Sequence, residues 1–332
     1  MAAAQLTFTR YANDLKELLI RFLYTNAQNI LLLIFLRTQR FQMLNHLTII
    51  LLNIRPKRLI KDNTIQWVIF SFDRPMQLEA LLKSFSSFHP NETNVHILFR
   101  ASPGSMDSAY AELIHEFKHS QYSFIREANF KKDLMSILHG SCCSMVSFLV
   151  DDIIFLAPMP LKSAGKLINR GAVYSPRLGI KTQYSYASRV NFPTPSFISE
   201  NAFPNLSLWK WNQGMVEWNY PISLDGHIFL LSEFIAMAKA VTFESPNQLE
   251  AKLQAFLGIF LSRFGACMAK QQLINIPANK VQSDYPNRYG NISQEELLNL
   301  WNQGYRINPL RIPTPSFTSP HEELDLLSAL EK

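Results

Sequence analysis

The chain has 332 residues, of which 47% are hydrophobic and 12% aromatic, with a net charge of +6. This composition provides a sizeable core for one large domain or two modest ones, and it excludes a low-complexity disordered chain. Cys142, Cys143 and Cys267 show no CxxC or Cys/His spacing, which excludes a disulfide framework and favours a reducing, cytoplasmic setting.

The basic charge is concentrated at the N-terminus. Residues 1–61 carry nine basic side chains and two acidic ones, a net charge of +7, whereas the other 271 residues sum to −1. Because a nucleic-acid-binding fold needs a basic face on its main body, we predict no nucleic-acid partner.

An apolar stretch, residues 18–52, lies within this basic extension. Polar and charged residues interrupt it, so no run of 18 consecutive apolar residues occurs, which argues against a transmembrane helix. No signal-peptide cleavage site is evident. Two interpretations remain for the predicted helical extension, residues 1–61. It packs on the main domain, or residues 18–61 lie on an anionic membrane surface at the cytoplasmic face.

Predicted strands and helices alternate in the next part of the chain. The strands are Thr64–Phe72, Asn94–Phe99, Tyr122–Ile125 and Met145–Val150, and the helices between them are Met76–Phe85, Ser108–Lys118 and Phe130–Leu138. This order predicts an α/β fold, with a doubly wound, mostly parallel central sheet and helices on both faces.

Two adjacent aspartates, Asp151 and Asp152, follow the apolar strand Met145–Val150. Charges at the end of a buried strand are costly unless something pairs with them, and Mg²⁺ or Mn²⁺ suits hard oxygen ligands. The alternative is that the pair caps the next element or binds a Lys or Arg. Asp73-Arg74 and Arg100 also end predicted strands, and such sheets bind ligands at this edge, which favours a functional site there.

After Pro158 the pattern changes to a strand at Val173–Pro176, a polar and aromatic stretch, and helices at Leu231–Ala240 and Gln248–Arg263. We therefore expect four parts: the extension 1–61, a first half of the main domain at 62–160, a second half of the same domain at 161–307, and an extended proline-rich tail at 308–332.

The order of parts over roughly residues 64–305 resembles the GT-A fold glycosyltransferases, and bacterial family-2-like members most. Phe70–Pro75 matches the nucleotide-contacting loop after the first strand, Phe130–Asp133 the basic helix before the metal motif, and Val150–Asp152 the DXD-type motif itself. Its first position is Val150 where the family has an acidic residue. Asp152 matches the metal-binding position and Asp151 the position that contacts the sugar or ribose.

The resemblance implies a metal-dependent hexosyltransferase that moves a sugar from a UDP- or GDP-sugar to a hydroxyl of a glycan or a lipid-linked acceptor. It also implies that residues 62–160 form the nucleotide-sugar-binding half and residues 161–307 the acceptor-binding half of one GT-A domain. A bound Mn²⁺ or Mg²⁺ would stabilise the departing diphosphate as a Lewis acid. A sugar-phosphate nucleotidyltransferase is one alternative, but it should carry a glycine-rich loop where this chain has Asp73-Arg74-Pro75. A non-catalytic GT-A scaffold that binds a glycan or a protein partner is another, and Val150 keeps it open.

A second constellation contains Asp225, Gly226 and His227, in which the glycine permits a tight turn. By the resemblance, Asp225 is the general base for the acceptor hydroxyl and His227 a metal ligand or an acceptor contact. The alternative is a turn aspartate followed by a strand histidine with satisfied hydrogen bonds.

Other predicted donor contacts depend mainly on position in the fold. Asp73 and Arg74 could meet the base or ribose, Arg100 a phosphate, and Lys131 and Asp133 lie on the helix before the metal motif. Surface salt bridges are the alternative for each of them.

The predicted acceptor contacts are Trp211, Trp218 and Asn247. Indole faces stack on sugar rings, although they fill protein cores more often, and Asn247 could equally belong to a helix cap.

Overall fold

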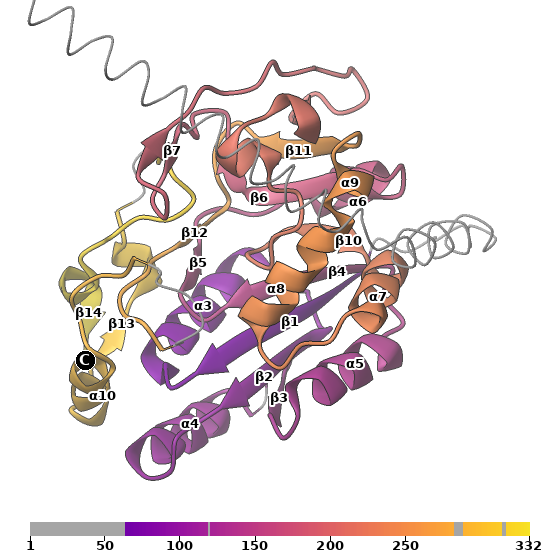
Figure 1. The fold of residues 1–332 in the computed structure, drawn as a ribbon. Coiled ribbons are helices and arrows are strands. Elements are labelled where there is room, and N and C mark those ends of the chain that lie inside the picture. The colour runs from indigo at the N-terminus through magenta and orange to yellow at the C-terminus, as the bar shows by residue number, and fades with distance from the viewer. Residues whose placement is uncertain (1–63, 119, 282–287, 314–316) are drawn as a thin grey trace, which may run out of the picture. The chain divides into compact units, whose positions relative to one another are not determined.

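The computed structural model describes residues 64–118, 120–281, 288–313 and 317–332 (Figure 1). The predicted extension, residues 1–61, and its predicted membrane-binding stretch, residues 18–61, lie outside the described residues. Within the described part of the chain, no helix combines the length and apolar character needed to cross a membrane.

One eight-stranded sheet organises the fold, in the order β3-β2-β1-β4-β10-β6-β11-β9. β3, β2, β1 and β4 are parallel, β10 runs antiparallel between β4 and β6, and β11 pairs parallel with β6 and antiparallel with β9. The prediction of an α/β fold with a mostly parallel sheet is confirmed. The strands are β1 (Ile65–Phe72), β2 (Val95–Arg100), β3 (Tyr122–Arg126), β4 (Met145–Val150), β6 (Val173–Gly179), β9 (Ser207–Lys210), β10 (Ile228–Leu230) and β11 (Phe264–Met268).

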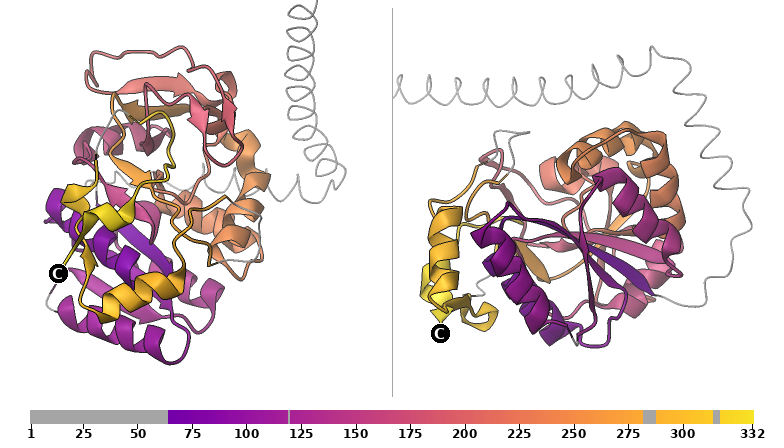
Figure 2. Two further views of the ribbon diagram at one scale, coloured as in Figure 1. Left: turned by 90° about the vertical axis from the view of Figure 1, so that its left-hand side faces the viewer. Right: turned by 90° about the horizontal axis from the view of Figure 1, so that it is seen from below.

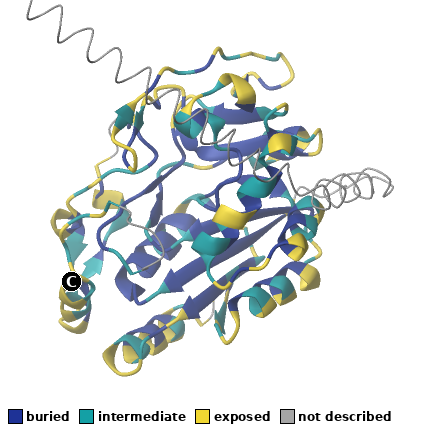
Figure 3. Cartoon of the chain, in the orientation of Figure 1, coloured by how far each residue is buried: buried dark blue, intermediate teal, exposed yellow. Residues whose placement is uncertain are grey.

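Helices cover both faces of this sheet (Figure 2). Their outer sides are exposed, whereas the strands between them are buried (Figure 3). The helices are α3 (Pro75–Phe88), α4 (Ser105–Glu116), α5 (Phe130–Gly140), α6 (Leu161–Ile168), α7 (Leu231–Ala240), α8 (Pro246–Leu253), α9 (Leu257–Phe260) and α10 (Gln294–Asn302), with 3₁₀ turns η1 (Trp211–Gln213), η2 (Val216–Asn219) and η3 (Gln254–Phe256).

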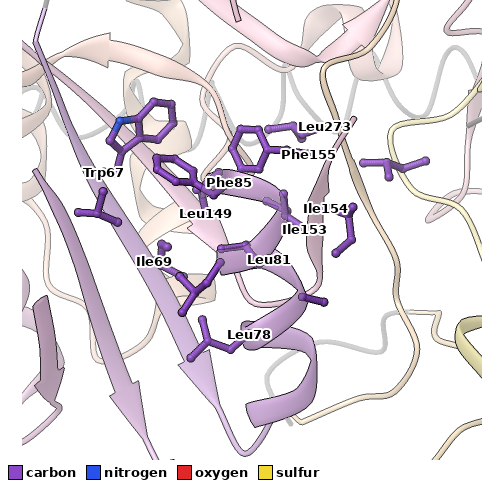
Figure 4. Close-up of a cluster of buried hydrophobic side chains, with 14 of the residues drawn as sticks. Trp67, Ile69, Leu78, Leu81, Phe85, Leu149, Ile153, Ile154, Phe155 and Leu273 are labelled. Carbon is purple, nitrogen blue, oxygen red and sulfur yellow. The ribbon is translucent and has the colours of Figure 1, made fainter. Parts of the chain in front are cut away.

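Two hydrophobic clusters flank the sheet, because side chains alternate between the faces of a strand. Trp67 and Ile69 of β1 point into one cluster with Leu81 and Phe85 of α3 (Figure 4). The intervening residues of β1 enter the second cluster, with side chains of α5, α7 and α8. The apolar run of β1 is continuous because both of its faces are buried.

In the part of the chain that the structure describes, three small antiparallel pairs lie outside the central sheet: β5 (Ile153–Phe155) with β12 (Leu273–Asn275), β7 (Tyr184–Ser185) with β8 (Val190–Asn191), and β13 (Arg306–Ile307) with β14 (Leu330–Glu331). The first pair matters for the site. It carries the segment after β12 past the aspartate pair, where the N–H of Ile276 donates to the carbonyl of Asp152 at 2.8 Å.

The predicted proline-rich tail, residues 308–332, is not an extended appendage. It forms η4 (Pro309–Arg311), η5 (Leu326–Ala329) and β14, and it lies beside α10 and β13 (Figure 1). Scattered apolar residues anchor it, because Ile312, Phe317 and Leu326 are buried in the first cluster. The prolines suggested an extended chain, but Pro309 begins a 3₁₀ turn, where its fixed φ is compatible with that geometry.

We expect Gly265→Ala to destabilise the fold by about 1–3 kcal/mol, since overpacking a buried site forces its neighbours to move. A Cβ on Gly265 of β11 would lie 2.3 Å from the ring of Trp209, which is fully buried. Gly258→Ala in α9 is the matched control, since its Cβ would meet nothing within 4 Å and alanine favours a helix. Urea unfolding of both variants tests this, and equal losses would contradict the packing.

Glu79 of α3 predicts a pH-dependent stability. Its carboxylate is fully buried, 2.6 Å from Lys83 Nζ and 3.6 Å from Arg306 Nε, and burial raises its pKa to about 7. Because this folded-state pKa lies above the ordinary value of 4.5, the folded protein holds the proton more tightly. Stability from this group is therefore full below about pH 4.5 and is lost as the pH rises through 7.

The variant Glu79→Gln removes that titration. We expect the difference in free energy of unfolding between wild type and variant to shift against the wild type by about 3 kcal/mol between pH 4.5 and pH 8. Urea unfolding across this range measures it, with Glu116→Gln, a largely exposed carboxylate near the same lysine, as control. A difference that stays flat with pH would show that Glu79 does not titrate in this way.

Candidate active site

The carboxyl ends of β1, β2 and β4 meet at one edge of the sheet, as parallel pairing requires. Asp73 follows β1 with a left-handed backbone (φ +53°), a conformation that aspartate tolerates better than most residues. Its carboxylate accepts hydrogen bonds from the backbone N–H (2.7 Å) and the hydroxyl (2.6 Å) of Ser102. Asp73 therefore joins the loops after β1 and β2.

Asp151, the first residue after β4, is buried and fully paired. It accepts hydrogen bonds from Ser71 Oγ at 2.9 Å, from the N–H of Phe72 at 3.1 Å and from Arg74 Nη1 at 2.9 Å. The sequence alternative of an arginine partner is thus realised for both aspartates, and the contact with Asp151 is the closer of the two.

Arg74 is a buried arginine that pairs with the aspartates at this edge of the sheet. Besides Asp151, its Nη1 lies 3.4 Å from Asp152 Oδ2, its Nε donates to Asn279 Oδ1 at 2.8 Å, and its Nη2 donates to the carbonyl of Asn279. Burial would lower the pKa of the guanidinium, but the two aspartates hold that pKa above its ordinary value. Arg74 therefore fixes the aspartate pair to the segment after β12 and directs its donors inward.

Asp152 is the more accessible member of the pair, with 14% of its side chain exposed against 5% for Asp151. Its Oδ1 accepts a long hydrogen bond of 3.3 Å from Asn275. Burial, together with the negative charges of Asp151 and Asp225, raises its pKa to about 6 despite the opposing effect of Arg74. Asp152 is therefore the aspartate of the pair that is more accessible to a ligand.

Asp225, whose negative charge acts on Asp152, comes from the other half of the chain. It lies in a turn where Gly226 has φ +87°, and a Cβ on that glycine would meet Leu273 at 2.6 Å. Its Oδ2 lies 3.6 Å from His321 Nε2 and 3.9 Å from Arg177 Nη1. Burial would raise the pKa of Asp225, but these two neighbours hold it below the ordinary value, so the carboxylate is ionised at neutral pH.

His227 takes the structural role that the sequence left as its alternative. It is fully buried, with Nδ1 3.0 Å from the carbonyl of Pro221 and Nε2 2.8 Å from Ser175 Oγ. Since a carbonyl only accepts, Nδ1 carries the proton and Nε2 accepts from the serine hydroxyl. Burial lowers the pKa of this imidazole to about 3. Neither nitrogen is free for a metal ion or an acceptor.

The histidine beside Asp225 is His321, which the sequence analysis missed. It lies in the C-terminal segment, which the structure brings to the site by pairing His321 with Asn275 at the end of β12. No local motif marks it. The sequence feature that could have indicated His321 is the presence of apolar residues within 308–332, such as Ile312, Phe317 and Leu326. Residues of this kind favour packing of the segment against the domain.

Of the other predicted donor contacts, Arg100 alone presents an exposed side chain at this edge, with its guanidinium carbon 3.9 Å from the ring centre of Phe72. Lys131 donates to the carbonyl of Val241 at 2.5 Å. Asp133 accepts two backbone N–H groups at the start of α5, at 2.7 and 2.8 Å. Lys131 and Asp133 therefore stabilise the fold around α5, and these hydrogen bonds do not indicate that either residue binds the donor.

The predicted acceptor residues are mostly core. Trp211 and Trp218 are fully buried and pack edge-on against Trp209, with ring centroids 4.7 Å apart in each pair. With no exposed indole face, neither can stack on a sugar in this conformation. Asn247 is partly buried in the first turn of α8, where Ser245 accepts the capping hydrogen bond from the N–H of Gln248.

No protein-family profile matches the chain. In sequence it is 25% identical over 199 residues to the bifunctional glycosyltransferase pgtA of Dictyostelium discoideum, covering 54% of this chain and 26% of that protein. The chain thus spans about a quarter of the length of this curated relative.

Solved structures with a remote likeness include TarS of S. aureus (residues 1–349), with a TM-score of 0.43, 12% identity, and coverage of 63% of this chain and 59% of that one. GalNAc-T7 with UDP, GalNAc and Mn²⁺ matches with a TM-score of 0.38 and 9% identity over 72% of this chain and 49% of that one. The chain is therefore similar in sequence to a glycosyltransferase, and the predicted resemblance to this class of enzyme is confirmed.

Proposed function

We propose that this protein is a glycosyltransferase that moves a hexose from a UDP- or GDP-sugar to a hydroxyl of a glycan or lipid-linked acceptor. The observation that carries the proposal is that Asp152, which follows β4, and Asp225, which precedes β10, lie at the same edge of the sheet because these two strands pair antiparallel. His321, from a distant part of the chain, lies beside Asp225. Open α/β sheets bind ligands at this edge.

On the donor side, the Arg74–Asp151 pair keeps the loop after β1 and the end of β4 in fixed positions. Asp73 does the same for the loop after β2. The exposed guanidinium of Arg100, at the end of β2, is the group we propose for contact with a phosphate, since a planar guanidinium pairs well with phosphate oxygens.

Mn²⁺ or Mg²⁺ is part of the proposal, with Asp152 as its protein ligand. Among the residues that the structure describes, no group of three or more His, Cys, Asp and Glu side chains is arranged to hold a metal ion. Asp152 nevertheless fits one, because it is the more accessible carboxylate of the pair, and Mg²⁺ sites commonly combine one or two carboxylates with substrate phosphates. When bound, the ion would supply Lewis-acid stabilisation of the leaving diphosphate.

Asp225 is the proposed general base. Its carboxylate is ionised and lies on the Asp152 side of the edge, which suits removal of the proton from an acceptor hydroxyl as that oxygen attacks the sugar. Asn247 stays a proposed acceptor contact. A cytoplasmic location with residues 18–61 on an anionic membrane surface also stays a proposal, supported by the charge and the apolar character of that stretch.

Calorimetric titration with UDP, GDP and their sugars, with and without Mn²⁺, tests the proposal. We expect one nucleotide to bind in a metal-dependent manner, and Asp152→Asn to weaken that binding at least about tenfold, or 1.4 kcal/mol. Asp325→Asn, an exposed aspartate that caps η5, is the control and should bind as the wild type does. A protein that ignores every nucleotide and metal would instead be the non-catalytic scaffold.

A further inference from the structure

We propose that Arg177 is a positioning residue that selects the tautomer of His321, so that the imidazole directs its N–H at Asp225. The assignment of the tautomer comes from the hydrogen-bond geometry alone. Its catalytic meaning rests on the proposed function, in which Asp225 is the base.

Arg177 lies on β6 with only 4% of its side chain exposed. Nη1 donates to Ser223 Oγ at 2.9 Å, and Nη2 donates to Glu217 Oε2 at 3.2 Å. Nη2 also lies 3.3 Å from His321 Nδ1. Glu217 is in turn held by Ser185 Oγ at 2.9 Å, so the guanidinium is fixed from two sides.

The tautomer follows from what these groups can do. A guanidinium has no acceptor and stays protonated, so Arg177 can only donate to Nδ1 of His321. Nδ1 must therefore carry its lone pair and no proton. A neutral imidazole has one N–H, which is then on Nε2, the nitrogen that lies 3.6 Å from Asp225 Oδ2.

The other neutral tautomer is disfavoured. An Nδ1–H tautomer would place its N–H directly against the N–H of Arg177. The charged and titratable groups around the pair come from several elements and include both signs: Arg177 of β6, Glu217 of η2, Asp152 after β4, Glu250 of α8, His227, Tyr220, and Tyr186, whose ring stacks on His321 with centroids 6.5 Å apart.

This arrangement places His321 where it can orient the carboxylate of Asp225. At 3.6 Å the Nε2–H is aimed at the carboxylate across a gap slightly longer than a hydrogen bond, a separation that catalytic groups often show before a substrate closes the site. His321 would hold one oxygen of Asp225 and leave the other for the acceptor hydroxyl. With its proton on Nε2, the imidazole has no lone pair there for a metal ion.

Two-bond ¹H–¹⁵N correlation spectra of the ¹⁵N-histidine-labelled protein at pH 8 test the assignment without any substrate. His321→Gln identifies the resonance of His321 among the eight histidines. We expect the Nε2–H pattern in the wild type and in Arg177→Lys, which keeps a donor, and a mixed or Nδ1–H pattern in Arg177→Met.

An Nδ1–H pattern in the wild type would overturn the proposal, and so would an Arg177→Met protein that folds and keeps the Nε2–H pattern. If Arg177→Met does not fold, the wild-type spectrum alone shows which tautomer His321 adopts and so tests the assignment. This result is independent of nucleotide binding, so a failure of the tautomer assignment and a failure of the proposed transferase function are distinguishable.

Discussion

Replacing Asp151 with asparagine is expected to lower the free energy of unfolding by about 3–5 kcal/mol, because it removes the nearer of the two carboxylates that compensate the buried charge of Arg74. The variant would leave the guanidinium of Arg74, which is buried, facing a neutral amide in place of a carboxylate 2.9 Å away. It would also place an amide NH₂ or a weaker acceptor opposite the donors Ser71 and Phe72.

Urea unfolding measures this loss against Glu200→Gln, which removes one partner of a largely exposed pair with Arg170 and should cost no more than about 1 kcal/mol. The double variant Asp151→Asn with Arg74→Met removes the uncompensated charge of the arginine as well. Its loss of unfolding free energy should therefore be smaller than the sum of the losses in the two single variants. Additive losses, or an Asp151→Asn loss as small as that of the control, would contradict the pairing.

The substitution Asp225→Asn is expected to reduce the rate of sugar transfer by about 10²–10⁴-fold, the usual contribution of a general base. Asparagine has nearly the same shape and can still accept a hydrogen bond from His321, but it cannot take up a proton. Affinity for the donor nucleotide should change little, because we propose that Asp225 acts on the acceptor hydroxyl.

Release of nucleotide diphosphate from a panel of UDP- and GDP-sugars with Mn²⁺ measures this rate, with Asp325→Asn as the control. Because the pKa of Asp225 is held below its ordinary value, the wild-type rate should not decline on this group's account between pH 8 and pH 5. A variant with more than about a tenth of the wild-type rate would show that Asp225 is not the base.

Much of the fold could be predicted because its information is local. Each strand from β1 to β4 is a short apolar run bounded by turn residues, and each intervening helix shows an apolar face at helical spacing. Parallel pairing then places the ends of β1, β2 and β4 at one edge. Asp151, Asp152 and Arg74 could therefore be assigned to the same place before any coordinates.

The partners of those residues could not be predicted, because they are distant in the chain. Asn279 is 205 residues from Arg74, and His321 is 144 residues from Arg177. A histidine near Asp225 was expected, but a local motif does not show which face of a strand is buried. The sequence therefore pointed to His227, whose nitrogens are satisfied inside the protein, and missed His321.

The burial of the predicted acceptor tryptophans could not be predicted from the sequence either. Trp211 and Trp218 belong to a polar, aromatic stretch without clear periodicity, so their burial depends on β9, β11 and the turn at η2 coming together. Composition alone identified them as large apolar groups. Only the packing against Trp209 shows that they form a core and present no surface to a sugar.

The location of a bound nucleotide tests the central claim most directly. A crystal structure of the protein with Mn²⁺ and the nucleoside diphosphate that binds best in calorimetry would show it. We predict that the diphosphate lies at the carboxyl edge of β1 and β4, with its metal ion on Asp152 and a phosphate within reach of Arg100. A nucleotide bound elsewhere, with that edge left free, would contradict the account.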